Sequence, residues 1–205
     1  LFSMEGTSPE LKKLAKLCEH FGTQLIVDEA HALGIMGTEG KGLCYGINYP
    51  VTIISGTFGK AFGSGGAFLA SNKKIGHHLI QTSGAFRYTT ALAPPLSAAA
   101  LAALRIIQAN PNWGIELQRQ AMLWRNKFKE KNWDLVTGNS PIIPLIMGSD
   151  ETTLKLQKKL ESKGMLTVAI RPPTVPEGKS RLRLVIRRNL PENALNQFLL
   201  ALSDS

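Results

Sequence analysis

The feature that most constrains this chain is a short apolar run followed by a glycine-rich loop with one lysine. The run at 51–54, V-T-I-I, is rich in β-branched residues and is typical of a buried strand. The loop at 57–66, T-F-G-K-A-F-G-S-G-G, then places Lys60 just past the end of that strand, where open α/β sheets bind ligands. A lysine that is partly desolvated there loses its proton more easily and attacks carbonyl carbons. The pattern therefore predicts Schiff-base chemistry with an aldehyde cofactor, of which pyridoxal 5'-phosphate (PLP) is the commonest.

Other functions for this loop fit less well. A P-loop requires G-x-x-x-x-G-K-[ST], but Gly56 and Gly59 are too close together, and Ala61 follows the lysine. The glycines after Lys60 do not form G-x-G-x-x-G either. A solvated lysine in a flexible loop remains the structural alternative, and only a second functional group can decide against it.

That second group follows another apolar run. Leu25, Ile26 and Val27 indicate a buried parallel strand, and Asp28 comes at its carboxyl end. A PLP site needs a carboxylate that keeps the pyridine nitrogen protonated, because the protonated ring is the better electron sink. His31 could hydrogen-bond the phenolic oxygen of the cofactor or stack on its ring. The structural alternatives are a turn former or helix cap for the aspartate and a surface residue for the histidine.

The first half of the chain reads as helices and strands in alternation, followed by a strand pair without an intervening helix. That exception predicts a mixed sheet with one antiparallel neighbour. We expect the Ala/Leu-rich helix to be well buried, and we expect Thr7 or Ser8 to cap the first helix. The expected helices are 9–21, 72–83 and 96–109, and the expected strands are 24–28, 51–55 and 66–70.

The sequence Asn110-Pro111-Asn112 predicts a domain boundary, which divides the chain into 1–110 and 111–205. The second part should begin with a bridging helix and continue as a small α+β domain. Pro144 places the strand that contains it at a sheet edge or a bulge. The expected helices are 113–131, 150–163 and 191–202, and the expected strands are 142–146, 165–170 and 181–187.

The composition is that of a globular protein, with 43% hydrophobic and 19% charged residues. The formal net charge of +9 could indicate nucleic-acid binding, but the basic residues are scattered and lack aromatic interleaving. A basic surface also suits coenzyme A or an acidic carrier protein. The two cysteines, Cys18 and Cys44, form no metal-ligand spacing, and no run approaches a membrane span. We therefore expect a cytoplasmic protein without metal, nucleic-acid or membrane binding.

Four motifs, in this order along the chain, resemble the α-oxoamine synthases. They are the opening L-F-S-M-E-G, the run V-D-E-A-H-A-L-G, the lysine loop, and A-I-R-P-P-T-V-P near the C-terminus. The resemblance runs over essentially the whole chain and is greatest to the biotin-pathway branch of the family. It implies an α/β fold, that of fold-type I PLP-dependent transferases. The chain would hold part of the large domain, with a mostly parallel, mixed sheet, and the small C-terminal domain.

The resemblance also implies a reaction and its substrates. The expected activity is a decarboxylating acyl transfer from pimeloyl-CoA, or pimeloyl carrier protein, to L-alanine, in a homodimer with the site at the subunit interface. The alternatives are sibling enzymes that use glycine with acetyl-CoA or serine with a fatty acyl-CoA, and a non-catalytic fragment that keeps the fold. Family members are about twice as long, so the chain would correspond to their C-terminal half and be incomplete as an enzyme. The glycine-rich phosphate turn and the group stacked on the ring would lie outside it.

The resemblance assigns further roles to individual residues. Ser3 would contact the cofactor near its phenolic oxygen, and Thr57 would bind its phosphate with the help of Ser64. Thr90, next to Thr89, would reach the phosphate in the neighbouring subunit. Their structural alternatives are polar turn residues.

Two further residues are candidates for substrate binding. Arg181 and Arg183 alternate along a predicted strand and so face one way. A forked guanidinium is the natural partner of an amino-acid carboxylate, and the resemblance selects Arg183. It also implies that Thr174, held between prolines, lines the acyl-substrate channel. A solvated strand face and an interdomain linker are the respective alternatives.

Overall fold

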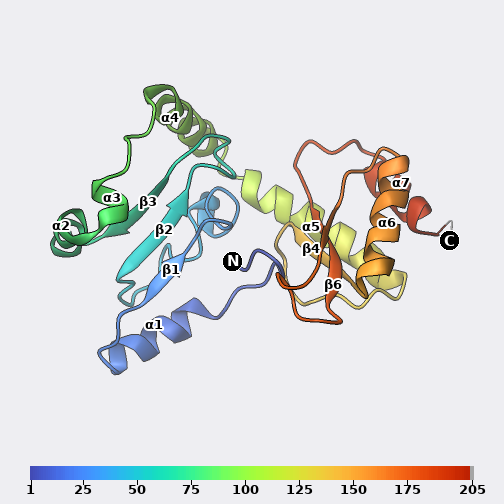
Figure 1. The fold of residues 1–205 in the computed structure, drawn as a ribbon, viewed down its shortest axis with the longest axis horizontal. Coiled ribbons are helices and arrows are strands. Elements are labelled where there is room, and N and C mark those ends of the chain that lie inside the picture. The colour runs from blue at the N-terminus through green and yellow to red at the C-terminus, as the bar shows by residue number, and fades with distance from the viewer. Residues whose placement is uncertain (204–205) are drawn as a thin grey trace. The chain divides into compact units, whose positions relative to one another are not determined.

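The computed structural model describes residues 1–203, which form two units (Figure 1). The first unit comprises Leu1 and Ser8–Ile115, and the second comprises Phe2–Thr7 with the residues from Glu116 onward. The sequence predicted a division between residues 110 and 111, whereas the structure divides five residues later, within a helix. The short segment Phe2–Thr7 belongs to the second unit because its hydrogen bonds are made there.

The sheet of the first unit has the order β1-β2-β3, with β1 at Ile26–Asp28, β2 at Ile53–Thr57 and β3 at Ala67–Ser71. Strands β1 and β2 are parallel, and β2 and β3 are antiparallel. The predicted mixed sheet is therefore confirmed. Because β1 and β2 run the same way, their carboxyl ends lie at one edge of the sheet.

The first unit also contains the helices α1 (Leu11–His20), α2 (Lys73–Thr82), α3 (Gly84–Arg87) and α4 (Pro94–Ala109), with a short 3₁₀ helix, η1, at Thr38–Gly40. The predicted side-chain cap on α1 is wrong. Glu10 occupies the N-cap position, two residues beyond Ser8, and makes no capping hydrogen bond. Asn72, in contrast, caps α2 through its side chain.

The prediction that the Ala/Leu-rich helix is well buried is also wrong. Only Ala100 of α4 is buried, while Leu101 and Ile106 are about half exposed. Leu96 packs near Gly65 of the lysine loop, and Ile107 lies near Gly34. An apolar composition shows that a helix can be buried, but the rest of the unit decides which of its sides is covered.

The second unit contains a three-stranded sheet of order β4-β6-β5, with β4 at Ile142–Gly148, β5 at Val168–Ile170 and β6 at Ser180–Val185. Both pairings are antiparallel. Pro144 lies in β4, an edge strand, as its missing N–H predicts.

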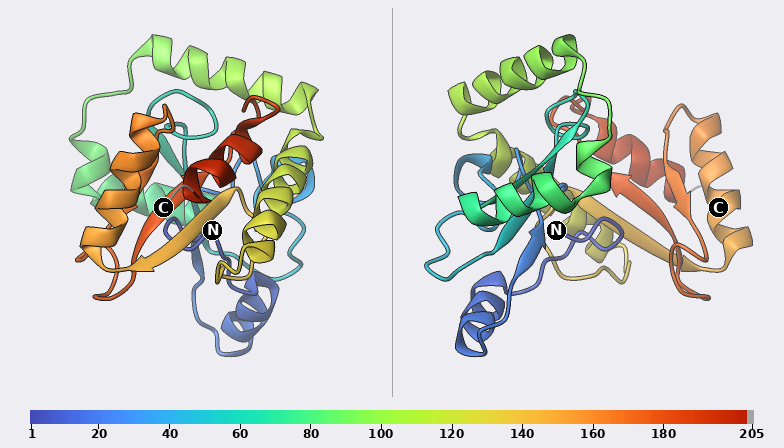
Figure 2. Two further views of the ribbon diagram at one scale, coloured as in Figure 1. Left: turned by 90° about the vertical axis from the view of Figure 1, so that its right-hand side faces the viewer. Right: turned by 60° about the vertical axis from the view of Figure 1, so that its left-hand side comes forward.

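One face of this sheet carries the main hydrophobic core. The helices α5 (Trp113–Glu130), α6 (Asp150–Ser162) and α7 (Ala194–Ser203) contribute the helical half of this core. Figure 2 shows these helices and the sheet in two views. Trp124, Phe128 and Phe198 meet with ring centroids 5.5–6.0 Å apart. They pack on Leu182 and other alternate residues of β4 and β6. The opposite face of the sheet is then free to carry the two arginines of β6.

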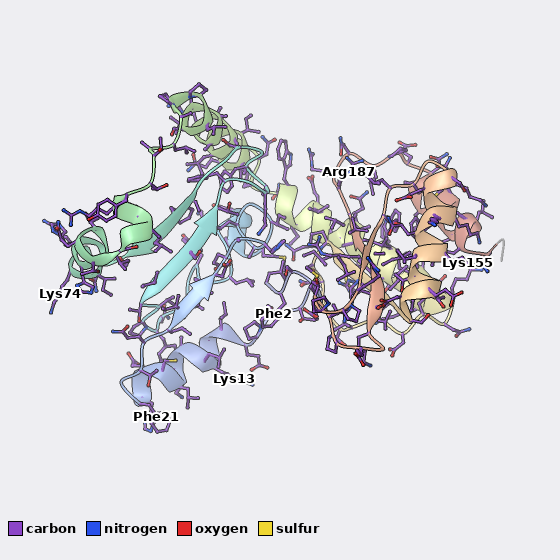
Figure 3. All side chains as sticks on the ribbon, in the orientation of Figure 1. Phe2, Lys13, Phe21, Lys74, Lys155 and Arg187 are labelled. Carbon is purple, nitrogen blue, oxygen red and sulfur yellow. The ribbon has the colours of Figure 1, made fainter. Side chains whose placement is uncertain are left out.

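Phe128→Ala is expected to lower the free energy of unfolding of the second unit by about 3–5 kcal/mol. Phe128 is fully buried, and the substitution would leave a cavity that the neighbouring side chains fill only in part. Urea unfolding followed by tryptophan fluorescence measures the change. Phe21→Ala is the matched control, since Phe21 is 70% exposed at the end of α1 (labelled in Figure 3), and it should shift the value by less than about 0.5 kcal/mol. Equal losses in the two variants would contradict this assignment of the core.

None of the helices within residues 1–203 combines the length and the apolar character that a bilayer crossing requires.

Candidate functional site

The parallel pair β1–β2 brings two predicted site elements to one sheet edge. Asp28 is the last residue of β1 and pairs with Ser55, two residues before the end of β2 at Thr57. The lysine loop begins directly after β2. The structure therefore places the carboxylate of Asp28 and the loop that carries Lys60 beyond neighbouring strand ends.

Backbone hydrogen bonds shape the lysine loop into a closed turn. Gly63 donates to the carbonyl of Lys60 at 2.9 Å, and Ser64 donates to the carbonyl of Phe58 at 2.8 Å. Phe58 in turn donates to the carbonyl of Gly66 at 2.9 Å. Lys60 thus lies at the tip of an ordered loop, and its side chain is exposed. The expected desolvation of its ammonium group is not found within the described residues.

Thr57 and Ser64 brace this loop. The hydroxyl of Thr57 donates to the carbonyl of Gly66 and accepts from the N–H of Gly59, both at 3.1 Å. The hydroxyl of Ser64 donates to the carbonyl of Leu96 at 2.7 Å. Phosphate binding by either hydroxyl remains a prediction. To donate to a phosphate, each hydroxyl would have to give up its present acceptor.

Asp28 is a turn former as well as a site candidate. Its Oδ1 accepts a hydrogen bond from the N–H of Ala30 at 2.7 Å, and the residue is exposed. His31 follows in the same turn and is partly buried. Within residues 1–203, neither Asp28 nor Lys60 takes part in an ion pair. A carboxylate and an amine without ion-pair partners after adjacent strands are the two groups that a PLP site uses.

The residue after Asp28 has a different role, which the sequence did not reveal. Glu29 is 1% exposed, and its Oε1 accepts from the N–H of Cys44 at 2.5 Å. Its Oε2 is buried without a hydrogen-bond partner. Burial, followed by the hydrogen bond and the charge of Glu29, raises the pKa of the Cys44 thiol to about 12. Glu29 therefore fixes the segment around Cys44, a second glycine-rich loop between β1 and β2, and only the fold distinguishes Glu29 from its neighbour Asp28.

The remaining candidate of the first unit, Thr90, is exposed in the segment between α3 and α4. Its role in a neighbouring subunit remains a prediction.

Three site candidates belong to the second unit. Arg183 on β6 donates from Nε to the carbonyl oxygen of Ser3 at 2.5 Å, and burial lowers the pKa of its guanidinium. Thr174 is exposed in the loop after β5, where its N–H donates to the carbonyl of Arg171 at 3.0 Å. The structure thus joins Ser3 and Arg183, which the sequence had assigned to different ligands. The predicted contact of the Ser3 side chain with the cofactor is not tested by this arrangement.

Arg181 differs from Arg183, although both lie on the same face of β6. Arg181 is 4% exposed and forms an ion pair with Glu5 at 3.1 Å. Its Nε donates to the carbonyl of Lys179 at 3.0 Å. The guanidinium of Arg181 is thus neutralised by Glu5, and the assignment of the substrate carboxylate to Arg183 remains a prediction.

A family model described as "Aminotransferase class I and II" matches residues 1–202. The chain belongs to this family. Among curated members, the 8-amino-7-oxononanoate synthases of Anaeromyxobacter dehalogenans strain 2CP-C and Nitrosospira multiformis are 37% and 39% identical over 206 and 186 residues. These alignments cover 100% and 90% of the chain but 52% and 47% of the relatives. The chain thus spans about half the length of the curated relatives it matches, whose names agree with the resemblance found in the motifs.

Solved structures of the family agree with the fold. The crystal structure of 8-amino-7-oxononanoate synthase from Francisella tularensis matches with a TM-score of 0.82 and 30% identity, over 98% of this chain and 58% of that one. Serine palmitoyltransferase from Sphingomonas wittichii matches with a TM-score of 0.90 and 24% identity, over 98% and 51%. The second likeness establishes the fold alone. The predicted fold, that of fold-type I PLP-dependent transferases, is confirmed by the family model and these structures.

Proposed function

We propose that this chain is part of a PLP-dependent acyltransferase that condenses L-alanine with pimeloyl-CoA, or pimeloyl carrier protein, to give 8-amino-7-oxononanoate in biotin biosynthesis. The observation that carries the proposal is the delivery of Asp28 and the lysine loop to one edge of a parallel strand pair. The names of the curated relatives support this choice of reaction. We also propose that the protein acts in the cytoplasm as a homodimer.

The residues of this chain divide the work of the reaction among them. PLP, when bound, supplies an aldehyde for an amine and a ring that withdraws electrons. The carboxylate of Asp28 would hold a proton on the ring nitrogen, and His31 would border the ring and stabilise charge. Nζ of Lys60 would hold the cofactor covalently and, once released, would accept the proton from Cα of alanine. Ser3, Thr57 and Thr90 are the further candidates for holding the cofactor.

The guanidinium of Arg183 would bind the alanine carboxylate, and Thr174 would line the path of the acyl chain. Overall, Cα of alanine bonds to the acyl carbon of the thioester, the thiol leaves, and the carboxylate is lost as CO2. The excess of basic residues, 24 Lys and Arg against 15 Asp and Glu, suits a polyphosphate or an acidic carrier as the acyl donor.

The experiment that tests the proposal is a substrate comparison in a full-length protein that contains this chain. CO2 release and product mass are followed with L-alanine plus pimeloyl-CoA, glycine plus acetyl-CoA, and serine plus palmitoyl-CoA. The first pair should give the highest kcat/KM. A higher value for either other pair would assign the protein to a sibling activity. Loss of turnover with all three would identify a non-catalytic protein that keeps the fold.

Arg183→Lys is expected to raise the KM for alanine about 10–100-fold while changing the KM for the thioester less than about twofold. Lysine keeps the positive charge but loses the two-nitrogen fork, and charge-assisted bidentate contacts of this kind are worth about 1.5–3 kcal/mol. Steady-state kinetics with each substrate varied in turn measure both constants. Arg188→Lys, on an exposed residue in the same unit, is the control. Equal effects on the two substrates would remove Arg183 from the carboxylate site.

A further inference from the structure

The segment Phe2–Thr7, here named the strap, is a preformed turn. Phe2 donates to the carbonyl of Thr7 at 2.8 Å, and Gly6 donates to the carbonyl of Phe2 at 2.9 Å. Gly6 has a φ of +68°, and a Cβ there would lie 2.2 Å from the carbonyl oxygen of Ile142. Only glycine allows both this conformation and so close an approach to β4. Figure 1 shows the strap as the dark blue segment that reaches toward β4.

Three side chains of the second unit, those of Ser140, Arg181 and Arg183, hold the strap. The hydroxyl of Ser140 donates to the carbonyl of Gly6 at 2.7 Å. Nη1 of Arg181 donates to Glu5 Oε1 at 3.1 Å and more weakly to the carbonyl of Met4 at 3.4 Å. The third contact is the hydrogen bond from Nε of Arg183 to the carbonyl of Ser3. Because the turn is closed on itself, the first two contacts fix where the third acceptor lies.

Arg125 of α5 stabilises the contact between Ser140 and Gly6. It is 2% exposed and donates to the carbonyls of Val136 and Ile142 at 2.9 and 2.6 Å, and more weakly to that of Ser140 at 3.4 Å. These bonds hold the segment that leads into β4. Arg125 is therefore a positioning residue for the hydroxyl of Ser140.

The strap determines how the guanidinium of Arg183 is hydrogen-bonded. Its neighbours across the sheet are Pro144 on β4 and Val168 on β5, which offer no side-chain hydrogen bond. The strap supplies the one acceptor that the structure gives this side chain within residues 1–203, and it binds Nε. Both terminal nitrogens are left for a ligand. Fixing Nε selects one orientation of the planar group, so the fork is oriented before any carboxylate arrives.

We propose that the strap is the device that orients Arg183 toward the carboxylate of an α-amino-acid substrate, and that Ser3 contributes to this through its main-chain carbonyl. The substrate class deepens the proposed function and rests on it. The orienting contact stands on the geometry of the second unit alone. Ser140, Glu5 and Arg125 are its positioning residues.

Hydrogen exchange at Nε of Arg183 tests the contact without cofactor or substrate. In a full-length protein that contains this chain, labelled with ¹⁵N-arginine, Arg183→Lys identifies the Nε–H signal by its loss. Ser140→Ala should speed exchange of this proton about 5–10-fold, the effect of losing one hydrogen bond that holds its acceptor. Glu5→Gln, a milder change at a half-exposed side chain, should speed it in the same direction. Glu116→Gln, which removes only the exposed contact with Arg188, should leave it unchanged.

The backbone N–H of Leu182 in β6 is the internal reference, because general unfolding would speed its exchange equally. Unchanged exchange at Arg183 in both strap variants, or equal acceleration at Leu182, overturns the proposal.

Kinetics of the same variants in the full-length protein test the link to substrate. Ser140→Ala and Glu5→Gln should raise the KM for alanine several-fold, with kcat and the KM for the thioester within about twofold. Faster exchange without this change in KM also overturns the proposal, because the contact would then be structural only. Failure of the proposed function gives a different result, in which the unaltered protein makes no product while the exchange pattern at Arg183 persists.

Discussion

Lys60→Ala is expected to abolish covalent attachment of PLP and to lower turnover at least about a thousandfold in a full-length protein that contains this chain. The ε-amine is the group proposed both to bond the cofactor and to accept the proton of the substrate, and alanine can do neither. The fold should be kept, because the side chain is exposed and the loop is held by backbone hydrogen bonds. The free energy of unfolding should change by less than about 0.5 kcal/mol.

Borohydride reduction followed by peptide mapping measures the attachment. The unaltered protein should carry the reduced adduct on the peptide that contains Lys60, and Lys60→Ala should carry none. Lys41→Ala is the matched control, since Lys41 is an exposed lysine in another glycine-rich loop of the same unit. An adduct on any lysine other than Lys60 would contradict the assignment of the site.

Asp28→Asn is expected to leave PLP bound but to slow proton abstraction about a hundredfold or more. Asparagine is nearly isosteric, and its side-chain oxygen can still accept the hydrogen bond from Ala30, so the turn should persist. Its neutral amide cannot hold the ring nitrogen in the protonated state, which removes the electron sink.

Exchange of the alanine α-proton with deuterated water, followed by NMR, isolates this step from acyl transfer. Asp134→Asn, at another exposed aspartate, is the control. Near-normal exchange in Asp28→Asn would show that Asp28 serves only to form the turn.

The sheet of the first unit could be predicted because its determinants are local. The run at 51–54 is β-branched, and the strand–loop–strand order before residue 72 leaves no room for a crossover helix, so a mixed sheet followed. The exposure of α4 could not be predicted in this way. Its Ala/Leu composition is compatible with burial on every side, and the covering surface is not encoded in the helix itself.

The residues of the candidate site likewise fall into those with a local sequence signal and those that depend on tertiary contacts. Asp28 was found because it directly follows an apolar run, and Lys60 because it lies in the glycine-rich loop after another. Glu29 was not singled out, because an acid beside an acid looks equivalent until one carboxylate is seen to be buried against Cys44. The role of the Ser3 carbonyl in holding Arg183 was also missed, because it depends on a contact between residues 180 positions apart.

This distance has a consequence for the order of folding. The strap leaves the ribosome before its hydrogen-bond donors in β6, and at 5–20 residues per second it waits about 10–40 s for them. Joining the ends of so long a segment carries a closure entropy of about 4–5 kcal/mol, unless the intervening unit has already folded and shortened the path. The second unit is thus a discontinuous domain whose last contacts form late in biogenesis. Arg183 would gain its orientation only when the chain as a whole is made.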